Sequence, residues 1–357
     1  MPLISPGSMV ARPRRKAIAT LNEFDLIRAL QRRYRSDGPG VLRGIGDDAA
    51  VIASNPRRSH LFTTDLLAEG IHFDLATATF VDVGFRAATA NLSDIAAMGG
   101  TPEYILVSLA MPQSASKVQV EQLYRGLMTA CRPHGVRLIG GDISASAAGW
   151  FLNITLVGSC PARDVLLRSG SKPGDNLYVT GTLGDSRAGL QLLQNGPRRS
   201  RSFISSRHRR LLVARHLRPT ARLREGCWLA RGRWATSAID ISDGLSGDLR
   251  HLCDESQVGV DLDLSMLPIT PACRAYALGL KQDPAMLALA GGEDYELLFT
   301  VPSHRSARFE RATRAHRIRV TRVGRMLPSG RGLHMIMPSG RRQPLPLVSY
   351  EHFRSQR

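Results

Sequence analysis

Acidic residues beside glycine or hydroxyl residues recur along this chain, although most of its charged residues are arginine. The motifs are Gly46-Asp47-Asp48, Thr63-Thr64-Asp65, Gly141-Asp142, Asp240-Ile241-Ser242-Asp243-Gly244 and Gly292-Glu293-Asp294. Any single motif has an ordinary explanation, because aspartate and glycine are common in turns and at helix caps. Several follow short apolar stretches that predict strands, so their acids would gather at one end of a sheet, where ligand crevices form. The repetition favours one shared site.

The composition of these motifs points to a hard divalent cation such as Mg²⁺. Such ions prefer oxygen ligands, usually a few carboxylates together with water and substrate phosphates. The hydroxyls of Thr63, Thr64 and Ser242 suit the same coordination shell. Asp94 adds an independent indication, since it lies in a run of small residues three positions after Asn91, on the same face of a predicted helix. A charged residue on a face built for close packing needs a partner, and a cation would supply one.

Signals for phosphate binding are weaker than those for the metal. The chain has no G-x-x-x-x-G-K-[ST] motif, which excludes a P-loop enzyme. The turn 181–184 could offer backbone N–H groups to phosphate, or it could be a tight connection that needs its glycines. Arg168 could clamp phosphate oxygens in bidentate fashion. No neighbouring Cys–His or Ser–His–Asp residues indicate covalent catalysis.

Alternating strand and helix patterns predict the elements that carry these motifs. Helices are expected near Asn22, over 82–98 and 118–131, and after Asp185 and Gly244; strands are expected over 61–65, 105–111, 136–139, 151–157, 177–180, 236–239 and 295–301, with a basic connector over 197–210. This interleaving predicts an α/β or α+β protein. The length of 357 residues fits two domains. We expect a disordered basic tail at 1–20, an N-terminal domain at 21–160 and a C-terminal domain at 161–357.

Charge and cysteine content limit the possible partners and compartment. Lys and Arg number 48 against 30 Asp and Glu, so the formal net charge is +18. A basic chain attracts polyanions in general. The arginine clusters at 12–15, 198–210 and 305–342 lack zinc-finger spacing or an aromatic stripe, so we interpret them as solvated surface and expect no specific nucleic acid. Five scattered cysteines without a C-x-x-C pair indicate a reducing cytoplasm, and no apolar run is long enough for a membrane span.

Read in order, eight motifs resemble those of thiamine-monophosphate kinases. They are the segments 44–51, 63–73, 91–99, 138–142, 168–175, 179–185, 239–245 and 291–297. That family belongs to a superfamily of ATP-binding enzymes similar to aminoimidazole-ribonucleotide synthetase. The resemblance extends from about residue 22 to residue 353. It implies a two-domain α/β (α+β) subunit of the aminoimidazole-ribonucleotide synthetase-like fold, with the N-terminal domains paired in a homodimer.

The resemblance also implies an activity and a set of site residues. The enzyme would phosphorylate thiamine monophosphate to thiamine diphosphate with ATP as co-substrate, by direct in-line transfer in thiamine diphosphate biosynthesis. Several Mg²⁺ ions would be held by Asp48, Thr63, Thr64, Asp65, Asp94, Asp142, Asp240 and Asp243. ATP would be bound by Tyr124, Gly141, Asp142, Arg168 and Ser242. Thiamine monophosphate would be bound by His72, Glu293 and Tyr350.

Two alternatives remain open at this point. One is a sibling ATP-dependent enzyme of the same superfamily, and the other is a non-catalytic basic protein that binds nucleotide or nucleic acid on this scaffold. The hydrogenase-maturation sibling uses a C-terminal cysteine and the selenophosphate-forming sibling an N-terminal one. Here the cysteines run only from Cys131 to Cys273, which disfavours both. The chain departs from the family pattern at Ile143 and Ser349, where a hydroxyl residue and a glycine are usual.

Overall fold

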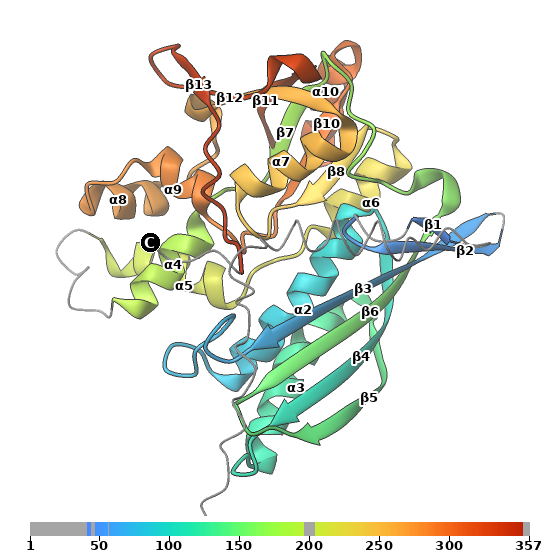
Figure 1. The fold of residues 1–357 in the computed structure, drawn as a ribbon, viewed down its shortest axis with the longest axis vertical. Coiled ribbons are helices and arrows are strands. Elements are labelled where there is room, and N and C mark those ends of the chain that lie inside the picture. Colours follow the sequence, from blue (N-terminus) through green and yellow to red (C-terminus); the bar gives the residue numbers. More distant parts are fainter. Residues whose placement is uncertain (1–40, 44–46, 56, 196–203, 353–357) are drawn as a thin grey trace, which may run out of the picture.

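The structure is a computed structural model that describes residues 41–43, 47–55, 57–195 and 204–352. The predicted tail at 1–20 and the helix expected near Asn22 lie outside the described residues. Two sheets, each with helices packed against it, make up the described part (Figure 1). The predicted α/β class is confirmed.

The first sheet has six strands in the order β1-β2-β3-β6-β4-β5, and only β4 and β5 run parallel. Its strands are β1 (Val41–Arg43), β2 (Ala50–Asn55), β3 (Arg58–Ala68), β4 (Thr101–Met111), β5 (Arg137–Ala145) and β6 (Phe151–Pro161). Helix α2 (Phe80–Ala97) packs on one face, and α3 (Lys117–Cys131) packs against α2. Side chains alternate along β3, with Leu61 and Thr63 buried on the helix side and Phe62 and Thr64 exposed on the other.

The second sheet has seven strands in the order β13-β12-β9-β11-β7-β10-β8. Its strands are β7 (Asn176–Thr180), β8 (Ser237–Asp240), β9 (Val258–Asp263), β10 (Leu297–Val301), β11 (Val320–Pro328), β12 (Leu333–Ile336) and β13 (Arg342–Pro344). The helices of this half are α4 (Asp185–Gln194), α5 (Ser206–Leu217), α6 (Leu223–Arg231), α7 (Leu245–Ser256), α8 (Pro271–Gly279), α9 (Pro284–Ala290) and α10 (Ser303–Ala315). None of the helices in the described ranges has the length and apolar character needed to cross a membrane.

The two halves meet along α2 and share a hydrophobic core. One continuous cluster of buried side chains runs from the first sheet and α2 to Leu297 and Phe299 of β10. Helix α6 approaches α2 so closely that a Cβ atom on Gly226 would lie 2.0 Å from the Ala96 carbonyl oxygen. Because α2 contacts both halves, residues on it can join groups from the first sheet to groups from the second.

Four predicted elements differ from the structure. Strands β3 and β5 are longer than expected, so the 63–65 and 141–142 motifs lie inside strands rather than at their ends. Strand β10 begins at Leu297 instead of residue 295, because Tyr295 is in the left-handed region at φ 51°. The prediction of a connector over 197–210 is wrong for its last residues, which are helical. Helix α5 begins at Ser206, where the Ser205 side chain accepts from the His208 N–H at 3.2 Å.

Close backbone contact between α2 and α3 depends on glycine. A Cβ atom added at Gly84 would lie 1.9 Å from the Leu123 carbonyl oxygen, and one added at Gly126 would lie 1.9 Å from the Val81 carbonyl oxygen. These contacts involve rigid backbone rather than flexible side chains. The two helices therefore have a fixed separation, which fixes the position of α2 and of the polar residues that it carries.

We predict that Gly84→Ala lowers the free energy of unfolding by about 2 kcal/mol or more, because the methyl group forces the two helices apart. Alanine is intrinsically the better helix former by about 1 kcal/mol, so the clash has to outweigh that gain. Urea denaturation measures the difference. Gly330→Ala is the control, since a Cβ atom there has nothing within 4 Å. Equal stability of the two variants would contradict the close packing.

Candidate active site

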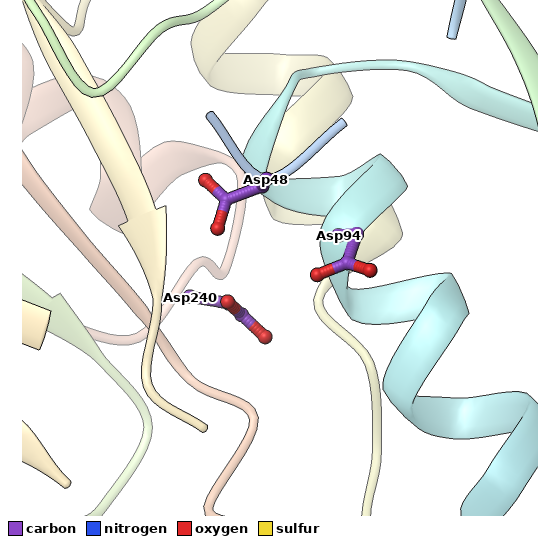
Figure 2. Close-up of side chains that lie close together, drawn as sticks. All are labelled: Asp48, Asp94 and Asp240. Carbon is purple, nitrogen blue, oxygen red and sulfur yellow. The ribbon is translucent and has the colours of Figure 1, made fainter. Parts of the chain in front are cut away.

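Three aspartates from distant parts of the sequence converge between the two halves of the chain. Asp48 precedes β2, Asp94 lies on α2 and Asp240 ends β8. Each offers a carboxylate oxygen within 4.8 Å of the others. Figure 2 shows the three side chains directed toward a common space. We call these residues, together with the adjacent Asp65, the carboxylate cluster.

Neighbouring polar groups fix the orientation of each carboxylate. The Arg168 guanidinium donates to Asp48 Oδ1 at 2.6 Å. The Ser93 hydroxyl donates to Asp240 Oδ2 at 2.6 Å, and the Thr63 hydroxyl donates to Asp94. The arrangement therefore draws on α2, β3, β8 and the segment before β7.

The electrostatics of the carboxylate cluster favour a bound cation. Burial, and then repulsion from Asp65 and Asp240, raises the pKa of Asp94 well above its usual value. Burial and then Asp48 likewise raise the pKa of Asp240, and they raise that of Asp65 to about 6. Asp48 Oδ2 is buried, and it has no hydrogen-bond partner among the described residues. Buried carboxylates that repel one another, one of them with an oxygen that accepts no hydrogen bond from the described residues, match the donor set that Mg²⁺ prefers.

Two residues predicted as metal ligands lie on the other face of the first sheet. Thr64 is exposed there, with its hydroxyl 3.2 Å from the Thr155 hydroxyl. Asp142 is exposed on β5 and pairs with Ser108 of β4, which pairs with Asn153 of β6. Since β5 is three strands from β3, Asp142 lies roughly 14 Å from that strand. A single copy of the chain does not bring these two residues to the carboxylate cluster.

The three residues predicted to bind the acceptor do come together. His72 Nε2 lies 3.3 Å from His352 Nε2, and the Tyr350 hydroxyl lies 3.2 Å from His352 Nδ1. Glu293 is ion-paired with Arg86, whose guanidinium also donates to the His72 carbonyl oxygen at 3.1 Å. We call His72, Glu293, Tyr350 and His352 the acceptor cluster.

The loop after β8 connects the two clusters. The Glu293 N–H donates to the Ser242 carbonyl oxygen at 2.7 Å, and the Tyr350 N–H donates to the Asp243 carbonyl oxygen at 3.0 Å. Ser242 and Asp243, both half-buried, thus lie between Asp240 and the acceptor cluster. Of the residues predicted to bind ATP, Arg168 and Ser242 are beside the carboxylate cluster. Gly141 lies on β5 and Tyr124 is half-buried on α3, so the structure does not gather all of them.

The turn at 181–184 is a structural connection and not a phosphate cradle. The Gly184 N–H donates to the Asp294 carboxylate at 2.7 Å, and the Ser186 N–H donates to the same carboxylate at 3.1 Å. The N–H groups of Gly181 and Leu183 donate to backbone carbonyl oxygens. Asp294 therefore occupies the N-terminus of α4, where an anion would otherwise bind.

Comparison with known proteins identifies the family. The domain "AIR synthase related protein, N-terminal domain" matches residues 46–160, and "AIR synthase related protein, C-terminal domain" matches residues 172–335. Thiamine-monophosphate kinase of Escherichia coli (strain K12) is 36% identical over 332 residues, which cover 93% of this chain and 98% of that protein. The chain belongs to the thiamine-monophosphate kinase family.

Solved structures agree with membership of the thiamine-monophosphate kinase family. The structure of AaThiL complexed with AMPPCP and TMP has a TM-score of 0.80 and 34% identity, over 93% of this chain and 97% of that one. The hydrogenase maturation protein HypE of E. coli has a TM-score of 0.65 at 18% identity, over 91% of this chain and 97% of its own. At that identity HypE shares the fold alone. The predicted family and its two-part fold are confirmed.

Several residues of the site were not predicted from the sequence. Asp47 is beside Asp48, and burial followed by repulsion from Asp48 raises its pKa to about 6. Its place in an acidic doublet was a usable signal. The position of Ser93 next to Asp94 was a weaker signal that Ser93 belongs to the site. Arg86 and His216, which contact Glu293, gave no signal, because basic residues are common throughout this chain.

We predict that Asp65→Asn stabilises the metal-free protein at pH 7 by on the order of 2 kcal/mol, and by progressively less toward pH 4. The pKa of Asp65 is about 6 in the folded protein against 3.8 in the unfolded chain, so the folded state binds the extra proton between these values. Stability contributed by wild-type Asp65 is therefore lost as pH rises through 6. Urea denaturation with chelator at pH 5 and pH 7 measures the effect. Glu121→Gln, at an exposed position on α3, is the control; a pH-independent difference for Asp65→Asn would contradict the prediction.

Proposed function

We propose that this chain phosphorylates thiamine monophosphate to thiamine diphosphate with ATP. The observation that carries the proposal is the carboxylate cluster joined to the acceptor cluster through the Ser242–Asp243 loop, in a member of the thiamine-monophosphate kinase family. The complex of AaThiL with AMPPCP, an ATP analogue, and TMP supports the same pair of substrates. The arrangement suits transfer between two phosphates, because it combines a place for cations with a separate place for an organic acceptor.

We infer that Asp48, Asp65, Asp94 and Asp240, with the Thr63 hydroxyl and Asp243, hold Mg²⁺. Asp48 Oδ2, which has no partner within the described part of the chain, and the raised pKa values of Asp94 and Asp240 support this assignment. When bound, Mg²⁺ supplies positive charge that offsets the phosphate groups of both substrates. Arg168 lies at the edge of the same cluster, and we assign its guanidinium to contacts with phosphate oxygens. The acceptor phosphate is ionised at neutral pH, so the protein has to position it rather than remove a proton from it.

We propose that two copies of the chain pair through the open face of the first sheet. Exposed apolar side chains on this face include Phe62, Leu66 and Tyr104. All nine residues of β5 are exposed, which leaves a long strand edge for a partner. Thr64 and Asp142 would then lie at the dimer interface. There Gly141 and Asp142 would bind nucleotide in the assembled dimer.

The divisions of the chain and its compartment are also proposals. We assign residues 21–160 to pairing and to ATP and Mg²⁺ binding, to which Asp240 and Asp243 of the second part contribute, and residues 161–357 to an α/β domain with acceptor contacts, to which His72 of the first part contributes. The change of sheet between β6 and β7 supports that division. We propose a cytoplasmic location. All five cysteines are free thiols and four of them are buried, which supports a reducing compartment.

We predict that purified protein with ATP, Mg²⁺ and thiamine monophosphate yields equal amounts of thiamine diphosphate and ADP. Chelator should abolish the reaction, and free thiamine should not replace the acceptor. Asp240→Asn should lower kcat by at least about a hundredfold with the fold retained, because it removes one charge from the carboxylate cluster. Asp261→Asn is the control, since Asp261 lies on β9, four strands from β8, and pairs with Arg342 of β13. Nucleotide binding without diphosphate formation would contradict the assigned substrate.

We predict that Tyr104→Glu converts the dimer to a monomer, because it places a charge on the apolar open face. Light scattering coupled to size-exclusion chromatography measures the mass. Val118→Glu, at an exposed position of α3, is the matched control and should leave the dimer intact. A wild-type protein that is monomeric at micromolar concentration would refute the pairing.

A further inference from the structure

A buried arginine lies beneath the acceptor cluster and contacts both halves of the chain. Arg86 is on α2, and its side chain is only 3% exposed. Its guanidinium donates to the Glu293 carboxylate, which belongs to the second half, and to the His72 carbonyl oxygen of the first half at 3.1 Å. One side chain therefore sets the distance between two residues that are far apart in sequence and are both assigned to the acceptor.

Glu293 is held from several directions but keeps one open side. Its backbone has a left-handed φ of 61°, and its N–H donates to the Ser242 carbonyl oxygen at 2.7 Å. One carboxylate oxygen pairs with Arg86, and the other lies 3.5 Å from His216 Nδ1 of α5. The side chain nevertheless remains 30% exposed. The carboxylate thus has a fixed orientation and an accessible edge.

The charges around Glu293 keep this carboxylate ionised. Burial, the largest single effect, would raise its pKa, but the Arg86 guanidinium together with His216 and His72 outweighs burial, and the pKa is lowered. His216 adds to this effect only when it is protonated; burial lowers its own pKa to about 4, so at neutral pH Arg86 is the charged partner of Glu293. The net result is a negative, oriented group whose open edge suits an organic cation or an amino donor. Thiamine monophosphate carries both, a thiazolium ring and an aminopyrimidine.

We propose that Arg86 is a positioning residue for the acceptor, holding Glu293 and the His72 carbonyl so that the open edge of the carboxylate meets the cationic thiamine moiety. The inference rests on the proposed function and deepens it, because it names what determines selectivity for the acceptor. The described partners of Arg86 belong to the acceptor cluster and not to the carboxylate cluster. Arg86 therefore governs acceptor binding and leaves phosphoryl transfer from the bound complex nearly unchanged.

The test compares Arg86→Gln, Arg86→Lys and Arg218→Gln in the full-length protein. Arg218 is the matched control, because its Nε pairs with Asp82 of the same helix α2 at 2.7 Å and links the same two halves without touching Glu293. Steady-state kinetics give kcat and the KM values for ATP and thiamine monophosphate. Calorimetric titration of thiamine monophosphate into the Mg²⁺-loaded protein without ATP gives its Kd independently of turnover. Phenyl phosphate, a phosphate monoester with a neutral ring, is titrated as a competitor.

We expect Arg86→Gln to raise both KM and Kd for thiamine monophosphate roughly tenfold or more, since a hydrogen-bonded charge pair is lost. The KM for ATP, kcat at saturating acceptor and the affinity for phenyl phosphate should change less than about threefold. Arg86→Lys, which retains the charge, should restore part of the affinity. It also carries the test if Arg86→Gln does not fold. Arg218→Gln should leave every one of these constants nearly unchanged.

Three results would overturn the inference. One is an unchanged Kd for thiamine monophosphate in Arg86→Gln. Another is an equal loss of affinity for phenyl phosphate, which would indicate general damage to the site. The third is a loss in Arg218→Gln as large as that in Arg86→Gln, which would assign the effect to packing of the halves. Absence of thiamine diphosphate formation by the wild-type protein is a different result, since it overturns the proposed function itself together with the inference.

Discussion

Repulsion between buried carboxylates is the interaction on which the rest of this structure depends. Asp48, Asp94 and Asp240 come from three separate segments, and each is held in place by a hydrogen bond from a neighbouring side chain. In the absence of a cation this arrangement costs free energy, which the surrounding packing has to offset. The shared core along α2 and the close helix contacts at Gly84 and Gly226 supply a rigid frame for it. The fold therefore stores electrostatic strain where a metal ion would relieve it.

Helix α2 is the element that relates this strain to recognition of the acceptor. Asp94 near its C-terminal end faces the carboxylate cluster, while Arg86 two turns earlier faces the acceptor cluster. Asp94 is eight positions after Arg86, so the helix fixes their axial spacing at about 12 Å. Because the helix contacts both sheets, a displacement of either half would change the geometry of both clusters.

The sequence predicted the fold class, and the position in the fold of several candidate site residues, for reasons that can be stated. Asp94 was predicted correctly to lie on a closely packed helix, because helical periodicity places it with Asn91. Asp240 was correctly placed at the end of a strand. Thr64 and Asp142 show the limit, since strand ends are poorly defined by sequence and a shift of one residue reverses the face to which a side chain points. Arg86 could not be found, because its burial depends on packing between distant segments and arginine is abundant in this chain.

The hydrogen bonds around His72 have a defined direction, and this has a consequence for what can approach them. The Ala68 N–H donates to His72 Nδ1 at 3.0 Å, so the proton of the neutral ring is on Nε2. Burial lowers the pKa of His72 and favours that neutral form. His72 Nε2 then donates to His352 Nε2, and His352 Nδ1 in turn donates to the Tyr350 oxygen. The proton of the Tyr350 hydroxyl consequently points away from His352. The direction of these bonds is thus set from the Ala68 backbone outward to the Tyr350 hydroxyl.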